Sequence, residues 1–218
     1  MSGNHFDAMA GDWDQDEAKV ARAETIAGAI TRAVPLGAGT RLLEYGAGTG
    51  LVAQALTGHV GAVTLADSST GMRQVMHEKV AAGMLPGARV WDLDLETQPV
   101  PAERFDLIVT SLVLHHVREL DRVLAGFAEL LAPGGHVCIA DLDREDGSFH
   151  SHDFEVHHGF DRAELTERLH AAGLTDVSVG DCTELVREGV SYSVFLAVAG
   201  AQLRATAPAS SAQRRRRW

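Results

Sequence analysis

Cysteine is scarce in this chain: Cys138 and Cys182 are the two present among 218 residues. Neither belongs to a CxxC pair, so the sequence supports neither a disulfide framework nor a zinc knuckle. Both lie in apolar, strand-like runs. We therefore expect two buried thiols without redox or metal chemistry.

Long hydrophobic runs are also missing. No stretch approaches the roughly 18 apolar residues that a membrane span requires. Residues 1–7 lack the basic-then-apolar pattern of a secretory signal. These absences predict a cytoplasmic protein with no membrane partner.

Positive charge is in short supply, because 19 Lys and Arg face 30 Asp and Glu, for a net charge of −11. Nucleic-acid binding depends on clustered Lys and Arg, so no nucleic-acid partner is expected. The exception is the run Arg214–Arg217, inside the Ala-, Ser- and Pro-containing stretch 201–218. We expect a disordered, basic tail there, and prefer a solvated tail to an RNA or membrane anchor.

Strand-like and helix-like segments alternate along residues 1–200, which we expect to form one domain of parallel βαβ units. The apolar runs that predict strands are 42–43, 62–66, 88–91, 105–109 and 136–140. The helical stripes fall in 17–33, 120–131 and 161–172, the last with Asp161 and Glu164 at capping-box spacing and Gly173 as a stop. Two further strand candidates, 177–181 and 191–198, flank the charged stretch 184–189 and could pair as an antiparallel hairpin.

Three glycines, Gly46, Gly48 and Gly50, follow the first predicted strand and precede a helical segment. Glycine at such a turn allows a ligand to approach the backbone closely. A dinucleotide fingerprint would place its third glycine at position 51, where this chain has Leu51. The spacing therefore counts against a nicotinamide cofactor, as does the lack of a Tyr-x-x-x-Lys pair.

Acidic residues close the second and third predicted strands. Asp67 follows the glycines at about the distance expected for a carboxylate that binds ribose hydroxyls, although it could instead cap the helix beginning near Ser69. Asp92 could hold the exocyclic amine of an adenine, or could simply be solvated together with Asp94 and Glu96.

Five motifs in order make the chain resemble a class I S-adenosylmethionine-dependent methyltransferase of the small UbiE-like, or methyltransferase 11, type. They are Leu43–Gly50, Asp67–Met72, Asp92–Leu93, Phe105–Val117 and Leu131–Gly135. The resemblance implies a Rossmann-like, doubly wound α/β fold with a mostly parallel seven-stranded sheet, an antiparallel last strand and helices on both faces. It also implies a cover region (1–35), a cofactor-binding half (40–140) and a substrate-side connection with closing strands (141–200).

The same resemblance implies roles in binding S-adenosyl-L-methionine. The three glycines would approach the methionine part, Glu44 would orient its amino group, and Ser111 would lie beside the sulfonium. Asp67 would bind the ribose. The residues implied on the adenine side are Ser68, Met72, Asp92 and Leu93.

Methyl transfer from a sulfonium needs mainly an aligned nucleophile, and a histidine suits removal of its proton near neutral pH. The catalytic candidates are His116, His150 and His157, and the substrate-contact candidates are Trp13 and His158. His116 could equally pack against a helix. For the stretch 150–158, a solvated loop, an acid–base role and a metal site stay open, and because its spacing matches no strong metal motif we expect no metal.

Few aromatic residues, 6% of the chain, are available to wall a substrate pocket. By position the wall-forming candidates are Trp13, Phe149, Phe154, Phe160 and Tyr192.

The leading hypothesis is an enzyme that methylates an O, N, S or C atom of a small molecule by in-line displacement. The alternatives are a non-catalytic S-adenosylmethionine-binding regulator and a nicotinamide-dependent oxidoreductase. The oligomeric state is not predicted.

Overall fold

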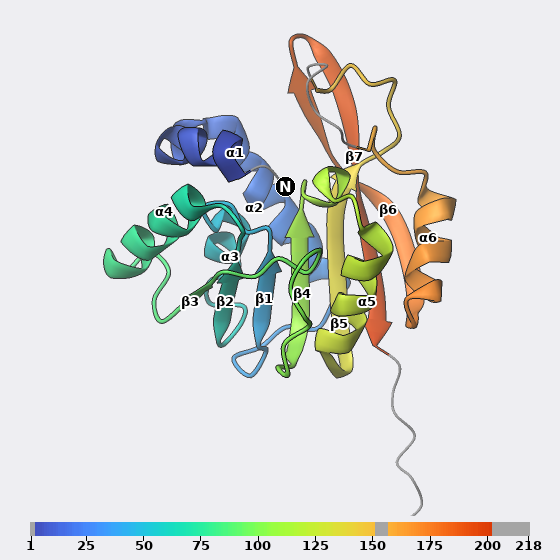
Figure 1. Ribbon diagram of the computed structural model, residues 1–218, viewed down its shortest axis with the longest axis horizontal. Coiled ribbons are helices and arrows are strands. Elements are labelled where there is room, and N and C mark those ends of the chain that lie inside the picture. The colour runs from blue at the N-terminus through green and yellow to red at the C-terminus, as the bar shows by residue number, and fades with distance from the viewer. Residues whose placement is uncertain (1–2, 151–156, 202–218) are drawn as a thin grey trace, which may run out of the picture.

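The computed structural model describes residues 3–150 and 157–201 of the chain. Its strands form a seven-stranded sheet in the order β3-β2-β1-β4-β5-β7-β6 (Figure 1). The strands are β1 (Leu42–Tyr45), β2 (Val63–Ala66), β3 (Arg89–Trp91), β4 (Phe105–Ser111), β5 (Leu131–Leu142), β6 (Leu174–Arg187) and β7 (Val190–Ala201). The first five are parallel, and β7 runs antiparallel between β5 and β6. The predicted fold is confirmed.

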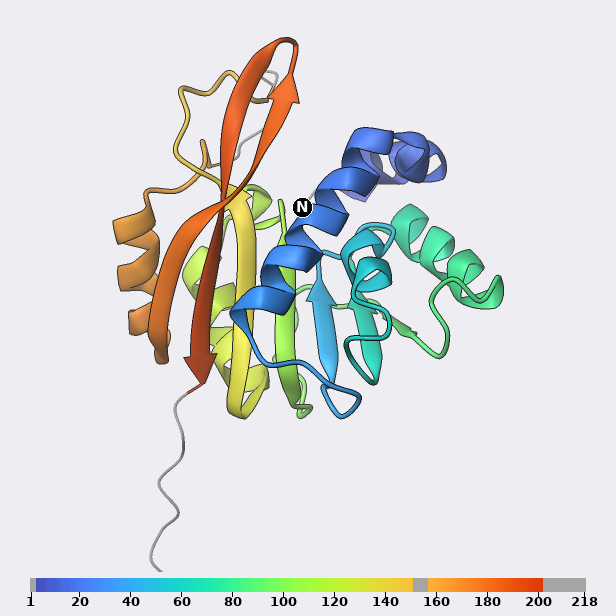
Figure 2. The same cartoon turned by 180° about the vertical axis from the view of Figure 1, so that it is seen from behind.

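Helices cover both faces of this sheet (Figures 1 and 2). The helices are α1 (Gly3–Met9), η1 (Ala10–Gln15), α2 (Glu17–Ala33), α3 (Leu51–Ala55), α4 (Thr70–Ala81), η2 (Leu114–His116), α5 (Leu120–Leu130) and α6 (Arg162–Ala171). The side chains of a strand alternate between the two hydrophobic cores, one on each face of the sheet, because successive side chains point to opposite faces. In β5, for example, Cys138 and Ala140 belong to the core under α2–α4, whereas Val137 and Ile139 belong to the core under α5 and α6.

The local signals predicted for α6 are present. The Asp161 side chain accepts hydrogen bonds from the backbone N–H groups of Ala163 and Glu164, at 2.9 and 3.0 Å. Gly173 follows the helix with a φ of +89°, which favours glycine. The prediction of where the helix begins and ends is therefore confirmed.

The closing hairpin is longer than predicted. β6 continues through the charged stretch to Arg187, and Glu188 and Gly189 alone form the turn, both with positive φ. Positive φ at both central residues matches the twist of a two-residue hairpin. Our assignment of 184–189 as a connection was wrong, because most of it belongs to β6. Charged residues are tolerated there because β6 is an edge strand with few buried residues.

The second cysteine also departs from expectation. Cys138 is fully buried, whereas Cys182 on the edge strand β6 is only half-buried, so the prediction that both are buried holds for the first alone.

The predicted tail begins one residue too early, since Ala201 is the last residue of β7. The rest of that tail, including Arg214–Arg217, lies outside the described residues. Among the residues described, no helix has the length and apolar character to cross a bilayer.

The carboxyl ends of the parallel strands form one edge of the sheet, and two other elements rise beyond that edge. One is the cover segment, α1 with η1 (residues 3–15), and the other is the β6–β7 hairpin (Figures 1 and 2). Ligands of open α/β sheets bind beyond this edge. The fold thus directs attention to the loops after β1, β2, β4 and β5.

Candidate active site

The glycine turn after β1 adopts left-handed backbone at all three glycines, with φ of 66°, 56° and 79° at Gly46, Gly48 and Gly50. A Cβ at Gly46 would fall 2.5 Å from methyl groups of Val113, so packing excludes any side chain there. A Cβ at Gly48 would meet only the Trp13 indole nitrogen, at 4.0 Å. The turn therefore packs tightly beneath and stays open above, as close ligand approach requires.

A cavity of about 520 Å³ lies over this turn. Of the predicted cofactor residues, its wall includes Glu44, Gly46, Gly48, Asp67, Ser68, Met72 and Ser111. The structure therefore brings together residues from the ends of β1, β2 and β4 that are far apart in the sequence. A cavity of this size is within the usual range for cofactor and small-ligand sites.

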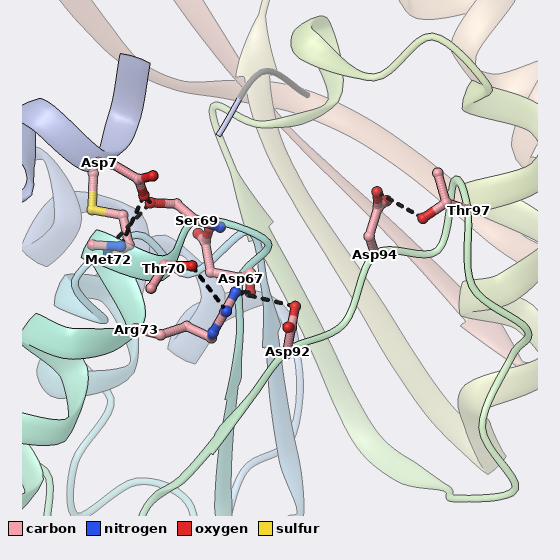
Figure 3. A network of polar contacts seen from close by, with 10 residues as sticks. Asp7, Asp67, Ser69, Thr70, Met72, Arg73, Asp92, Asp94 and Thr97 are labelled. Atoms are coloured by element: carbon pink, nitrogen blue, oxygen red, sulfur yellow. Dashed lines mark hydrogen bonds and ion pairs between the residues drawn. The ribbon is translucent and has the colours of Figure 1, made fainter. Parts of the chain in front are cut away.

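Asp67, the acid after β2, is held in the cavity wall by the backbone. Its Oδ2 accepts from the N–H of Gly48 and its Oδ1 from the N–H of Ser69, both at 2.8 Å. Burial raises the pKa of this carboxyl, and the two N–H donors oppose that shift. The N-cap of α4 is Ser69, whose Oγ accepts from the N–H of Met72, so Asp67 is not the cap (Figure 3).

Asp92 and Leu93 do not line this cavity. The Asp92 carboxylate is largely exposed and pairs with Arg73 at 3.1 Å, and the same Arg73 nitrogen donates to the Asp67 carbonyl (Figure 3). Leu93 is buried in the core under α5 and α6. The predicted adenine-side set is thus split, with Ser68 and Met72 on the cavity wall and the other two residues away from it.

Glu44 is buried at the end of β1, where its carboxylate accepts from the backbone N–H of Ala53 at 2.9 Å. Burial raises the pKa of this carboxyl to about 8, although Ala53 and the nearby Lys79 oppose the shift. An un-ionised carboxyl here can be converted to the charged form by a cationic ligand group placed beside it.

The cover segment closes over the cavity through two carboxylates. Asp7 accepts from the hydroxyl of Ser69 at 2.5 Å and from the N–H of Gly71 at 2.8 Å. Asp14 accepts from the Lys79 ammonium at 2.7 Å and also from the hydroxyl of Thr49. The bonds of Asp14 tie η1 to both α4 and the glycine turn.

Trp13, a predicted substrate contact, lies on the cavity wall in η1, with the Lys19 ammonium 4.1 Å from its ring centroid. Phe149 also lines the cavity, and Tyr192 packs edge-on against it with ring centroids 5.0 Å apart. Phe160 is buried beside Phe195 instead, and Phe154 lies outside the described residues.

Histidines form the wall of the cavity beyond Ser111. His115 is buried, and its Nδ1 lies 2.6 Å from a carboxylate oxygen of Asp141, itself fully buried at the end of β5. Asp141 also accepts from the backbone N–H groups of Leu114 and Leu142. The rings of His116 and His150 lie next to His115, with centroids 4.1 and 5.1 Å away.

Sequence reasoning missed the His115–Asp141 pair. Asp141 directly follows the predicted strand 136–140, and that position was a signal which sequence reasoning did not use. Its partnership with His115 arises only when β5 aligns beside β4. Of the predicted catalytic histidines, His116 and His150 line the cavity. Burial, followed by the charge of His115, lowers the pKa of His150 to about 4, so this imidazole is neutral at physiological pH.

His157 and His158 are exposed and do not line the cavity. The backbone N–H of His157 donates to the carbonyl of His115, and the His158 ring lies 3.4 Å from Glu145. This hydrogen bond joins the backbones of His157 and His115. It does not direct the His157 imidazole toward the cavity. His152 lies outside the described residues.

A sheet of this order, with a glycine turn and a carboxylate at the ends of its first two strands, defines a class I S-adenosylmethionine-dependent methyltransferase fold. A family model described as a methyltransferase domain matches residues 19–179, and the chain belongs to that family. Membership of this family speaks against the nicotinamide-dependent alternative.

Curated relatives share part of the chain. An uncharacterized methyltransferase of Schizosaccharomyces pombe is 30% identical over 125 residues, which cover 50% of this chain and 44% of the relative. The ubiquinone/menaquinone biosynthesis C-methyltransferase UbiE of Shewanella piezotolerans is 31% identical over 90 residues, 41% of this chain and 36% of the relative. The chain thus matches less than half the length of either.

Solved structures share the fold at low identity. The phosphoethanolamine N-methyltransferase 2 of Haemonchus contortus, solved with S-adenosyl-L-methionine, superposes with a TM-score of 0.67 at 16% identity. The match covers 90% of this chain and 60% of that structure. At this identity the likeness concerns the fold alone.

Proposed function

We propose that this enzyme transfers the methyl group of S-adenosyl-L-methionine to a small molecule by in-line displacement. One observation carries the proposal: the cavity that contains the glycine turn and Asp67 continues to the histidines after β4. Cofactor and acceptor then share one enclosed space, which lets the nucleophile align with the methyl group. The acidic net charge of the chain supports a small molecule rather than a nucleic acid as acceptor.

In this proposal the cofactor lies along the carboxyl ends of β1 and β2. Asp67 accepts from the ribose hydroxyls, and Glu44 faces the ammonium of the methionine part. The glycine turn provides backbone for the methionine chain, and Ser111 lies beside the sulfonium. Asp92 stays a predicted adenine contact that would need Arg73 to move. Leu93 stays a predicted contact through its backbone.

Arg22, which sequence reasoning also missed, extends the cofactor site. It lies on α2 in the cavity wall, half-buried, and no ion pair to it occurs within the described residues. Burial lowers the pKa of this guanidinium, which makes an anionic partner favourable. We assign it to the carboxylate of the methionine part, and expect Arg22→Met to weaken binding of S-adenosylhomocysteine about tenfold or more, measured by calorimetry.

The acceptor lies between Trp13, Phe149 and the histidine wall. Relatives are named as C-methyltransferases of ubiquinone/menaquinone biosynthesis. The aromatic walls of this cavity support an acceptor with an apolar body. His116 and His150 face it. His157 and His158 stay predictions, since both are exposed and neither lines the cavity.

Calorimetry with S-adenosylhomocysteine tests the cofactor site. Asp67→Ala should weaken binding by about 2 to 4 kcal/mol, the worth of two hydrogen bonds to a carboxylate. Asp121→Asn, which changes an exposed carboxylate on α5 paired with Arg168, is the matched control and should bind as the wild type does. Equal affinity of the Asp67→Ala variant and the wild type would refute the ribose role.

A further inference from the structure

Three histidines of the cavity wall converge. His115 and His116 come from η2 after β4, and His150 comes from the loop after β5. One potential ligand atom from each lies within 4.8 Å of the other two. The ring centroids of His116 and His150 are 4.9 Å apart, so the third pair is as close as the others.

The orientation of His115 is set from behind. Its Nδ1 lies 2.6 Å from Asp141, whose carboxylate is fixed by two backbone donors. Its Nε2 is buried and has no hydrogen-bond partner within the described residues. Metal-binding histidines in proteins commonly have one ring nitrogen hydrogen-bonded to a carboxylate and use the other nitrogen as the ligand. His115 has this arrangement, with Asp141 as the carboxylate.

The position of His150 is also braced. The Arg187 guanidinium, near the tip of the β6–β7 hairpin, donates to the carbonyl of Phe149 and lies over its ring, 5.6 Å from the centroid. The hydroxyls of Tyr192 and Ser148 are 2.8 Å apart. The long hairpin therefore holds the residues just before His150 against η2.

We propose that His115, His116 and His150 bind one divalent transition-metal ion of the Zn²⁺ type, with an open coordination position toward the cavity. This inference rests on the proposed function, because the open position would take the nucleophilic atom of the methyl acceptor. Nitrogens on a tetrahedral Zn²⁺ lie about 3.3 Å apart, so side-chain movements of about 1.5 Å close the site. Three neutral imidazoles leave the ion's full charge available to a fourth ligand.

The chemistry assigns the acceptor to the hydroxyl or thiol class. Metal binding of the acceptor breaks its O–H or S–H bond, the electron pair stays on the heteroatom, and the proton leaves to solvent. The resulting anion forms a bond to the methyl carbon while the carbon–sulfur bond breaks. That electron pair returns to sulfur, and S-adenosylhomocysteine departs as a neutral thioether.

The test uses chelator-treated, tag-free, full-length protein titrated with Zn²⁺ by calorimetry and with Co²⁺ by visible absorption. The wild type should bind one equivalent, and His116→Asn and His150→Asn should each bind at least about 100-fold more weakly. These two side chains are only half-buried, so the variants should fold. His115 is fully buried and is therefore left unchanged. His59→Asn, at an exposed position, is the control and should retain the site.

Two further measurements separate the possible results. Mercaptoethanol, a small thiol, should change the Co²⁺ spectrum of the wild type, and an unchanged spectrum would overturn the open position. Calorimetry with S-adenosylhomocysteine is run on the same samples. If the protein binds the cofactor but the wild type binds Zn²⁺ no more tightly than His150→Asn does, the metal site alone is overturned. If the protein binds Zn²⁺ but not the cofactor, the proposed function alone is overturned.

Discussion

At the scale of single residues, the chemistry of the cavity is dominated by carboxyl groups in different surroundings. Glu44 is fully buried, which raises its pKa to about 8 against the opposing effect of its backbone donors. Asp67 has two backbone donors, which partly offset its burial. A cationic ligand group placed beside Glu44 can therefore switch the charge of this carboxyl.

This difference predicts a pH dependence of stability. Between its ordinary pKa of 4.5 and the raised value of about 8, the unfolded chain has lost the Glu44 proton and the folded chain still holds it. The free energy of unfolding contributed by Glu44 therefore falls as pH rises through this window. Thermal unfolding of ligand-free wild type and Glu44→Gln from about pH 5 to about pH 9 should show the variant gaining relative stability with pH. Parallel curves would contradict the shift.

The site residues that could be predicted from the sequence are those whose position follows from one strand end. Glu44, Asp67, Ser68, Met72 and Ser111 each lie where the local motif placed them, on the cavity wall. His115 with Asp141 could not be predicted, because the pair depends on the register between β4 and β5. Arg22 could not be predicted either, since its position depends on how α2 packs across the sheet.

At the scale of elements, the strands and long helices could be predicted because their apolar periodicity is local. The length of β6 could not. An edge strand with polar residues on both faces has no alternation to read, and only pairing with β7 reveals that it continues to Arg187. That extension has consequences for the site, because it places the hairpin against Phe149 and so beside the histidines.

The cover segment leads to a prediction of its own. Lys79 is almost fully buried on α4, and its ion pair with Asp14 links η1 to that helix. Asp14→Asn should loosen that link and weaken binding of S-adenosylhomocysteine several-fold to tenfold, by analogy with hydrogen bonds to charged groups. Amide hydrogen exchange should accelerate in residues 3–15 and stay unchanged in α6.

The control for this measurement is Asp106→Asn, which removes an exposed pair with Arg41 at the opposite end of β4. It should affect neither the affinity nor the exchange of the cover segment. If Asp14→Asn exchanges and binds as the wild type does, then the segment is held by Asp7 and its aromatic packing instead.

At the scale of the whole molecule, the cofactor region is assembled from segments spread along the chain. The cover segment, the glycine turn, the start of α4 and the loop after β4 all contribute residues to one cavity, and the hairpin adds a further wall. The cover segment and the hairpin both lie beyond the carboxyl ends of the parallel strands (Figures 1 and 2). A ligand that fills the cavity contacts the native arrangement and has no counterpart site in the unfolded chain. Its binding free energy should therefore appear as global stability.

S-adenosylhomocysteine at about 100 times its dissociation constant should add about 2.7 kcal/mol to the free energy of unfolding. For a chain of this size, that corresponds to a rise in Tm of about 5 to 11 °C. Asp67→Ala, at the same ligand concentration, should lose most of the rise, whereas Asp121→Asn should keep it. NADH should cause none, because Leu51 stands where a dinucleotide turn has its third glycine. Equal rises with both ligands would mean that the cavity recognises an adenosine moiety without selecting the methionine part, and would leave Glu44 and Arg22 without their proposed roles.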